Sequence, residues 1–402
     1  MMESRDILIE GGYPISGALR VSGAKNSVLK LMAAAILAPG VTLITNVPMI
    51  SDVMLMGEVL RQLGVQVEFG ANSVRLDTSR LTSFSTPYEL VSQMRASITV
   101  LGPLLGRYGQ AQVSIPGGCN IGNRPIDLHY AALEALGVVF DTESGDILAS
   151  VPHGLQGVPF RLSFPSVGAT ENLMMAAVLA QGRTVIDNAA CEPEIADLAA
   201  YLQAMGAQIS GAGTSQIQIE GTSELQPVAR YQTIGDRIEA GTFLVAGALS
   251  GGPLTVSGVN PEHLTTALLK LRQMGVTVKT AANSITVSRQ RPLLATDVQT
   301  LPYPGFPTDL QAQYTLLDAL AAGSSIVAEN IFENRFQYAD ELVRMGANIQ
   351  IRGHFAHIRG VPSLSGAPVQ APDLRGGAAL VLAGLQADGE TRVTNTLHID
   401  RG

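Results

Sequence analysis

The chain has 402 residues, of which 46% are hydrophobic and 15% charged, with a formal net charge of -8. This composition predicts a packed protein of two or three domains, because disordered chains have fewer large apolar residues and a higher net charge. The acidic balance argues against nucleic acid as a partner, since a duplex-binding surface needs clustered Lys and Arg. Two distant cysteines, and no signal-peptide or membrane-spanning pattern, predict a soluble cytoplasmic protein.

An internal repeat of roughly 70 residues runs through the chain. Each copy has an Ala-rich apolar stretch, a Gly, and a β-rich segment with an apolar residue four positions after that Gly. In chain order the pairs are Gly40/Ile44, Gly109/Val113, Gly182/Ile186, Gly252/Val256, Gly323/Val327 and Gly389/Val393. The Ala-rich stretch favours a helix, the Gly suits a left-handed C-cap, and the alternation that follows predicts a half-buried strand.

A second helical pattern closes each of the first five copies with Leu or Met, then Gly, then Val or Ala. These endings are Leu63-Gly64-Val65, Leu136-Gly137-Val138, Met205-Gly206-Ala207, Met274-Gly275-Val276 and Met345-Gly346-Ala347. One copy alone could not bury both of its faces, so we expect two bodies of three copies. The polar segment 222–233 predicts the seam between them. The sixth copy's ending would fall beyond Gly402, so we expect that copy to lack its last helix and strand.

The first candidate site in chain order is Ser22-Gly-Ala-Lys-Asn-Ser27, directly before the first Ala-rich helix. Lys25 and Asn26 near a helix N-terminus could meet an anion with help from the helix dipole. The segment lacks the spacing of a phosphate loop. A solvated lysine is therefore the alternative.

A longer loop distinguishes the second copy, and its extra residues lie in Pro116-Gly-Gly-Cys-Asn-Ile-Gly-Asn-Arg-Pro125. Insertions confined to one repeat map to loops, and loops carry function. Cys119 lies among glycines with Arg124 and Asp127 close behind, and a nearby cation favours the thiolate. An ordinary surface loop with an inert cysteine remains the alternative.

Arginines occupy related places in several copies, as though each copy presents polar groups to one cleft; they are Arg95, Arg335, Arg375 and Arg401. Arginine suits bidentate binding of phosphate and carboxylate, although any single one could be a structural ion-pair partner. Asp309 follows a Pro-rich turn, where capping the next helix is the commoner role for an aspartate. His354 and His357 belong to no metal-binding pattern, and no dinucleotide fingerprint is present, so we expect neither metal nor cofactor.

Taken jointly, eight segments resemble those of the UDP-N-acetylglucosamine enolpyruvyl transferases, along almost the whole chain from Ile7 to Gly402. The segments are Ser22-Gly-Ala-Lys-Asn-Ser, Met94-Arg-Ala-Ser, Pro116-Gly-Gly-Cys-Asn-Ile-Gly-Asn-Arg-Pro, Ser166-Val-Gly-Ala-Thr, Asp236-Arg-Ile-Glu-Ala-Gly-Thr-Phe, Phe306-Pro-Thr-Asp-Leu-Gln-Ala-Gln, Phe332-Glu-Asn-Arg-Phe and His398-Ile-Asp-Arg-Gly. The sister family, the shikimate-phosphate enolpyruvyl transferases, shares the six-copy architecture but lacks the Gly-Gly-Cys loop.

The resemblance implies an α/β fold, an inside-out α/β barrel of two domains that each contain three βαβαββ repeats. We expect the first domain, with the Cys119 loop, to span 22–233. The second would comprise 1–21 and 234–402, with its last repeat incomplete.

The resemblance also assigns roles to residues. Cys119 would be the general acid and the target of fosfomycin, Asp309 the base, and Lys25 and Arg401 further catalytic residues. Contacts to phosphoenolpyruvate are implied for Lys25, Asn26, Arg95, Arg124, Arg375 and Arg401. Contacts to UDP-N-acetylglucosamine are implied for Asn26, Arg95, Arg124, Pro125, Asp127, Asp309 and Ile331.

The activity implied is transfer of the enolpyruvyl group of phosphoenolpyruvate to UDP-N-acetylglucosamine by addition and elimination, the first committed step of peptidoglycan synthesis. We expect small-molecule substrates, no cofactor, no nucleic acid, no membrane and a monomer. The alternatives are a non-catalytic relative that binds the sugar nucleotide, and a shikimate-phosphate enolpyruvyl transferase.

Overall fold

The computed structural model describes residues 6–91, 94–114, 126–143 and 145–402, and they form two compact units. The first unit is Gly23–Ile234, without the residues outside the described ranges. The second unit joins Gly235–Gly402 to the N-terminal segment that ends at Ser22. Each unit has its own hydrophobic core of buried residues.

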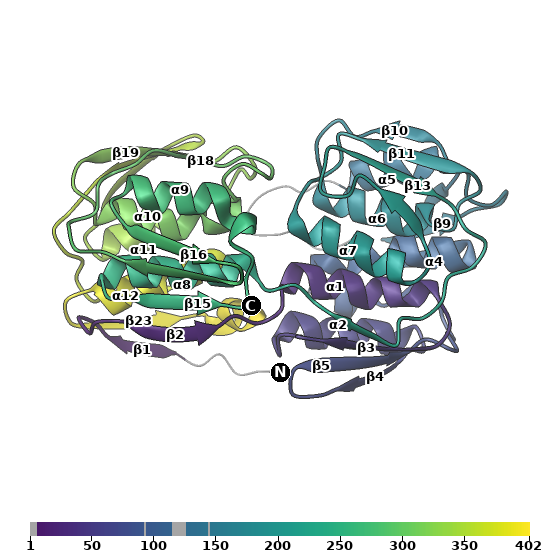
Figure 1. The fold of residues 1–402 in the computed structure, drawn as a ribbon, viewed down its shortest axis with the longest axis horizontal. Helices are drawn as coiled ribbons and strands as arrows, with labels where there is room; N and C mark the ends of the chain where they lie inside the picture. The colour runs from purple at the N-terminus through teal and green to yellow at the C-terminus, as the bar shows by residue number, and fades with distance from the viewer. Residues whose placement is uncertain (1–5, 92–93, 115–125, 144) are drawn as a thin grey trace. The chain divides into compact units, whose positions relative to one another are not determined.

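The first unit has three four-stranded sheets of the same design (Figure 1). In each, a central strand pairs in parallel with a short edge strand and antiparallel with a third strand, which pairs antiparallel with a fourth. The sheet orders are β14-β3-β5-β4, β6-β7-β9-β8 and β10-β11-β13-β12. The strands are β3 (Val41–Thr45), β4 (Gln66–Phe69), β5 (Ser73–Asp77), β6 (Ser85–Thr86), β7 (Gln110–Ser114), β8 (Val139–Glu143), β9 (Asp146–Ser150), β10 (Pro159–Arg161), β11 (Arg183–Asp187), β12 (Gln208–Ser210), β13 (Gln216–Glu220) and β14 (Arg230–Gln232).

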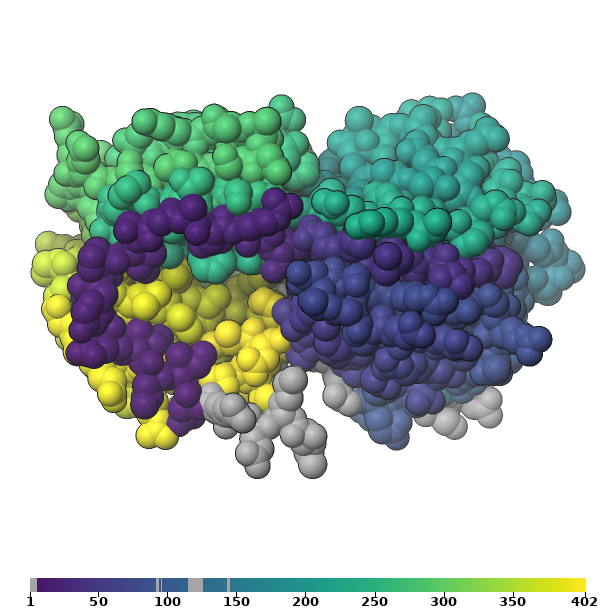
Figure 2. Space-filling model, turned by 60° about the horizontal axis from the view of Figure 1, so that its bottom comes forward, coloured from purple at the N-terminus to yellow at the C-terminus, as the bar shows by residue number. Residues whose placement is uncertain are grey.

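The second unit repeats this design in the sheets β16-β17-β15-β2 and β18-β19-β21-β20, and adds the three-stranded sheet β1-β23-β22. Its strands are β1 (Ile7–Glu10), β2 (Gly17–Arg20), β15 (Leu254–Ser257), β16 (Thr277–Ala281), β17 (Ser284–Ser288), β18 (Val298–Gln299), β19 (Ser324–Ala328), β20 (Asn348–Arg352), β21 (Phe355–Arg359), β22 (Pro368–Gln370) and β23 (Glu390–Thr394). The N-terminal strands complete two of these sheets, since β2 pairs with β15 and β1 pairs with β23. Figure 2 shows this N-terminal segment in purple against the yellow C-terminal part of the chain.

Within each unit the sheets lie at the surface, and some helices are enclosed while others, such as α9 (Thr265–Gln273) and α11 (Ala339–Arg344), keep an exposed face (Figure 1). The first unit contains α1 (Lys25–Ala34), η1 (Ala35–Leu37), α2 (Ser51–Gln62), α3 (Tyr88–Val91), η2 (Arg95–Val100), α4 (Leu101–Tyr108), α5 (Asp127–Ala135), α6 (Val167–Ala177) and α7 (Pro193–Ala204). The second contains α8 (Arg237–Ser250), η3 (Pro261–Leu264), α9 (Thr265–Gln273), η4 (Thr308–Leu310), α10 (Gln311–Ala319), α11 (Ala339–Arg344), α12 (Leu374–Gln386) and η5 (Thr396–Arg401). All nine residues of α10 are buried, as expected for a helix enclosed by other elements. The predicted inside-out α/β barrel is confirmed.

The repeat pattern predicted the central strand of every sheet. In each copy the apolar residue four positions after the glycine is fully buried; these residues are Ile44, Val113, Ile186, Val256, Val327 and Val393. Gly109 shows why the glycine is needed, because it ends α4 in the left-handed conformation with a φ of 68°. In the fourth copy the left-handed C-cap is Gly251, one residue before the glycine of the pattern.

A strand lies in the segment predicted as the seam. The polar segment 222–233 contains β14, which pairs in parallel with β3 from the start of the same unit. The segment has no alternating pattern, so its strand depends on the partner that tertiary structure provides.

Candidate active site

Asp309 lies at the centre of a charged cluster in the second unit. It is the middle residue of η4, which leads into the buried helix α10. One carboxylate oxygen, Oδ1, lies 2.6 Å from a guanidinium nitrogen of Arg335, and Oδ2 lies 3.2 Å from one of Arg375. The side chain of Asp309 is 27% exposed, whereas those of Arg335 and Arg375 are 4% and 11% exposed. The carboxylate is therefore reachable, while the cations that hold it are buried.

The charges around Asp309 decide its protonation state. Burial by itself raises the pKa of Asp309, but the charges of Arg375, Arg335 and Arg237 outweigh it and hold the pKa well below its ordinary value. Burial lowers the pKa of Arg375, and the charges of Asp309 and Asp236 more than offset this. Asp309 is therefore ionised near neutral pH. Together with Arg237, Arg335 and Arg375 it forms the Asp309 cluster.

Helix starts bring Arg237 and Arg375 to the cluster. The carboxylate of Asp236 caps α8 by accepting from the N–H groups of Ile238 and Glu239. Asp373 caps α12 in the same way, through the N–H groups of Arg375 and Gly376. Each cap is followed within two residues by an arginine, because both helices begin at related places in two repeats. The sequence did not single out Arg237, although this shared position was the signal that could have identified it.

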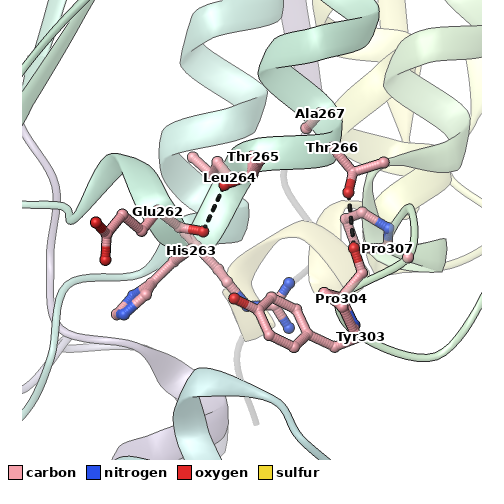
Figure 3. A pocket seen from close by; sticks show the side chains of 11 residues that line it. Glu262, His263, Leu264, Thr265, Thr266, Ala267, Tyr303, Pro304 and Pro307 are labelled. Atoms are coloured by element: carbon pink, nitrogen blue, oxygen red, sulfur yellow. Dashed lines mark hydrogen bonds between the residues drawn. The ribbon is translucent and has the colours of Figure 1, made fainter. Parts of the chain in front are cut away.

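A cavity of about 360 Å³ adjoins η4 and is lined by residues of the second unit alone (Figure 3). The guanidinium of Arg237 lies over the ring of Tyr303, 5.5 Å from its centroid. Thr266 Oγ1 donates to the carbonyl of Pro304 at 2.7 Å and so ties the start of α9 to the loop before η4. Pro307, the residue before η4, lines the cavity too, so the cavity reaches the segment that carries Asp309.

Two other predicted residues lie in the second unit. Ile331 follows β19, and its backbone N–H donates to Oε1 of Glu329 at 2.8 Å. Arg401 ends η5, which packs on α12 where a Cβ at Gly377 would come within 2.9 Å of Ile399 Cγ1. Glycine at this position thus lets the segment that carries Arg401 approach α12 closely.

Lys25 and Asn26 open α1 in the first unit. Lys25 Nζ lies 2.7 Å from Asp52 Oδ2, and both side chains are buried. One turn later, Lys30 Nζ lies 3.2 Å from Glu171 Oε2 in α6 and donates to the backbone carbonyl of Asn26. The two lysines are therefore held by carboxylates from two different helices.

A third carboxylate holds the same stretch of α1. Ser27 Oγ donates to Asp197 Oδ2 in α7, and Asp197 Oδ1 accepts from the hydroxyl of Tyr231 in β14 at 2.8 Å. Burial raises the pKa of Asp197, and these two hydrogen bonds oppose that rise. The α1 cluster (Lys25, Ser27 and Lys30 with Asp52, Glu171 and Asp197) thus fastens the start of α1 to α2, α6 and α7.

Five predicted site residues remain. Cys119, Arg124 and Pro125 lie outside the described residues. Arg95 is the first residue of η2, and Asp127, which is exposed, is the first residue of α5. Within the described ranges, no group of three or more His, Cys, Asp or Glu could hold a metal ion. In the same ranges, no helix has both the length and the apolar character needed to span a membrane.

Comparisons with known proteins identify a matching family and similar proteins. The model of the family described as EPSP synthase (3-phosphoshikimate 1-carboxyvinyltransferase) matches residues 9–402. The chain is 52% identical over 400 residues to UDP-N-acetylglucosamine 1-carboxyvinyltransferase 1 of Symbiobacterium thermophilum, which covers 98% of this chain and 90% of that protein. It is 50% identical over 395 residues to UDP-N-acetylglucosamine 1-carboxyvinyltransferase of Corynebacterium jeikeium, with 98% and 94% covered.

Solved structures are similar over the whole fold. The enolpyruvyl transferase NikO from Streptomyces tendae has a TM-score of 0.89 and 27% identity, with 100% of this chain and 95% of that chain covered. An EPSP synthase from Acinetobacter baumannii has a TM-score of 0.76 and 18% identity, with 99% and 96% covered. The second likeness is evidence for the fold alone.

Proposed function

We propose that this chain, which belongs to the EPSP synthase family, transfers the enolpyruvyl group of phosphoenolpyruvate to the 3-hydroxyl of UDP-N-acetylglucosamine and releases phosphate. The observation that carries this proposal is sequence identity. About half of the residues, over 98% of the chain, are identical to those of relatives whose names contain UDP-N-acetylglucosamine. Identity with the EPSP synthase structure is 18%, so shikimate 3-phosphate is the second candidate acceptor.

The Asp309 cluster has the chemistry that this reaction needs. In the addition step the sugar oxygen bonds to C2 of phosphoenolpyruvate, the hydroxyl proton goes to a base, and the methylene carbon takes a proton from an acid. In the elimination step that carbon loses a proton and the bond from C2 to the phosphate oxygen breaks. Proton transfers of this kind need no metal or organic cofactor. We assign the base to Asp309, which is ionised and partly exposed.

Three guanidinium groups, those of Arg237, Arg335 and Arg375, act on the single carboxylate of Asp309. Guanidinium groups bind phosphate and carboxylate well, and phosphoenolpyruvate carries both. An anion that engages Arg375 would weaken the hold of that cation on Asp309, and the pKa of Asp309 would then rise towards its ordinary value. Substrate binding would thus make the carboxylate a stronger base.

The remaining assignments rest on the resemblance of the sequence. We propose Cys119 as the acid and the fosfomycin target, with Lys25, Asn26, Arg95, Arg124, Arg375 and Arg401 around phosphoenolpyruvate. For the sugar nucleotide we propose Asn26, Arg95, Arg124, Pro125, Asp127, Asp309 and Ile331. The α1 cluster supports the first set, because it fixes the helix turn that carries Lys25 and Asn26. We further propose a cytoplasmic monomer that acts in peptidoglycan synthesis, and through it in cell shape and cell division.

Phosphate release from phosphoenolpyruvate tests the proposal. Turnover is expected with UDP-N-acetylglucosamine and not with shikimate 3-phosphate. The opposite preference would assign the chain to the shikimate-phosphate branch. Calorimetric binding of UDP-N-acetylglucosamine without turnover would identify a non-catalytic relative, and neither binding nor turnover would overturn the proposal.

A further inference from the structure

Four hydrogen-bond donors converge on the carboxylate of Glu329, a buried residue directly after β19. Oε1 accepts from Thr300 Oγ1 at 2.9 Å and from the backbone N–H groups of Ile331 and Phe332 at 2.8 and 3.1 Å. Oε2 accepts from Thr308 Oγ1 at 2.9 Å. Glu329 is only 1% exposed, so its charge is satisfied by these protein donors rather than by bulk water.

The donors come from three segments that are distant in the sequence. Thr300 follows β18, Thr308 begins η4, and Ile331 and Phe332 lie in the segment between β19 and α11. The neighbouring Asn330 ties the first and third segments again, since its N–H donates to Thr300 Oγ1 and its side chain donates to the Thr300 carbonyl. Glu329 therefore fixes the ends of two parallel strands and the start of η4 in one arrangement.

Two chains of contacts link Glu329 to the Asp309 cluster, one through Thr308 and one through Phe332 and Arg335. Thr308, held by Oε2, precedes Asp309 directly. Phe332, held by Oε1, supports Arg335, whose guanidinium lies over the Phe332 ring at 5.5 Å from the centroid. Arg335 in turn pairs with Asp309 at 2.6 Å. The same buried carboxylate thus sets the position of Asp309 and of the cation that holds it.

We propose that Glu329 is a positioning residue, which holds Asp309, Arg335 and the Ile331 segment in the geometry that the reaction requires. The proposal rests on the proposed function, and it assigns to Glu329 no contact with substrate. Buried carboxylates keep their donors in place because an unsatisfied charge in the interior is costly. A displacement of about 1 Å at a reacting group can lower a rate by about 10²-fold.

Three variants separate positioning from simple structural support. Glu329→Gln keeps an oxygen for the Oε1 donors, and the Thr308 hydroxyl can turn to accept from the new amide, so turnover should stay within about threefold of wild type. Glu329→Ala removes all four bonds, and kcat should fall about 10–100-fold. Thr308→Val keeps the shape and removes only the bond next to Asp309, so kcat should fall about 3–10-fold. This mild variant decides the question if Glu329→Ala does not fold.

The protonation of Asp309 supplies a readout that structural support alone would not move. The charged groups facing Asp309 are Arg375 from α12, Arg335 from its own segment and Arg237 from α8. If Arg335 shifts, the pKa of Asp309 rises, and both the acidic limb of the pH–rate profile and the carbon-13 titration of the Asp309 carboxyl move to higher pH. The matched control is Asp318→Asn, which removes another buried carboxylate of this unit, one that accepts from the Thr296 N–H. It should change neither readout.

The outcomes are distinct. Unchanged kcat and unchanged Asp309 titration in folded Glu329→Ala and Thr308→Val would overturn the proposal. Equal shifts in Asp318→Asn would overturn it too. If the wild-type protein has no turnover, the proposed function fails, and the carbon-13 titration alone still decides whether Glu329 positions Arg335 against Asp309.

Discussion

In the first unit, Lys25 and Lys30 each face a buried carboxylate, while in the second unit one carboxylate, Asp309, is shared by two arginines. The α1 cluster draws its acids from three helices and has more carboxylates than lysines. The Asp309 cluster has the opposite excess. Both hold a charged side chain at the start of a buried helix, but in the Asp309 cluster three cations act on one carboxylate.

This difference indicates that the α1 cluster stabilises the fold, whereas the Asp309 cluster serves the reaction. In the α1 cluster the carboxylates neutralise the lysines and tie α1 to its neighbours, so their removal should be felt in stability. In the Asp309 cluster the arginines keep one partly exposed carboxylate ionised, so its removal should be felt in the reaction. The substitutions below test the contrast, from the largest expected effect to the smallest.

Asp309→Asn removes the proposed base and should lower kcat by about 10²–10⁴-fold. The amide keeps the shape of the side chain, so UDP-N-acetylglucosamine binding should change far less. Phosphate release and calorimetry measure the two quantities. Asp340→Asn, an exposed aspartate in the first turn of α11, is the control and should behave like wild type. Full turnover in Asp309→Asn would remove the base from this cluster.

Cys119→Ser should lower turnover by about 10²-fold or more, because a hydroxyl is too weak an acid near neutral pH. Cys119→Asp should keep appreciable turnover with an optimum at lower pH, since a carboxyl can donate a proton and is more acidic than a thiol. Fosfomycin should alkylate the native thiol and leave the Asp variant unmodified. An inactive Asp variant beside an active Ser variant would contradict the acid role.

Asp52→Asn removes the carboxylate that faces the buried Lys25, and should lower the free energy of unfolding by about 3 kcal/mol. The double variant Lys25→Met/Asp52→Leu replaces both charges by apolar groups. It should recover most of the stability, as buried pairs often do, but no turnover. Denaturant unfolding and phosphate release are the measurements. Turnover in the double variant would mean that Lys25 only fastens α1.

Glu171→Gln tests the pH dependence of the α1 cluster. Burial raises the pKa of Glu171 from 4.5 to about 7, and the charge of Lys30 opposes that rise. The folded state therefore holds an extra proton between these values, so the contribution of Glu171 to stability is greatest below 4.5 and falls until about pH 7. Relative to wild type, the Gln variant should gain about 3 kcal/mol over that interval.

The second unit contains a comparable buried carboxyl, that of Asp318. Burial raises the pKa of Asp318 from 3.8 to about 7, so Asp318→Asn should show a gain of the same sign and at least the same size. Thermal unfolding of both variants at pH 5 and pH 8 is the measurement. A stability difference that does not depend on pH would show that these carboxyls titrate normally.

Tyr231→Phe removes the hydroxyl that donates to both Oδ1 and the backbone carbonyl of Asp197, and should cost about 1 kcal/mol. Kinetic constants should stay near wild type, because Ser27 still holds the same carboxylate. Denaturant midpoints measure the loss. A large drop in kcat would show that the α1 cluster positions reacting groups as well as fastening the helix.

The repeat determined much of the fold from the sequence alone. In each copy a helix, a glycine and a strand succeed one another, and one short pattern predicts the buried positions from Ile44 to Val393. This is possible because alternation and helix ends depend on neighbouring residues. The resemblance of a few segments likewise indicated Asp309 and Arg375, which the structure brings together.

Only the tertiary structure decided which strands pair with each other and which charged side chains meet. β14 forms because β3 lies beside it, and β1 and β2 complete sheets whose other strands are more than 200 residues away. The carboxylates that hold Lys25 and Lys30, and the place of Glu329 between three segments, depend on contacts across distant parts of the chain. No local pattern encodes such contacts, since a buried carboxylate is identified only by the donors that the fold places around it.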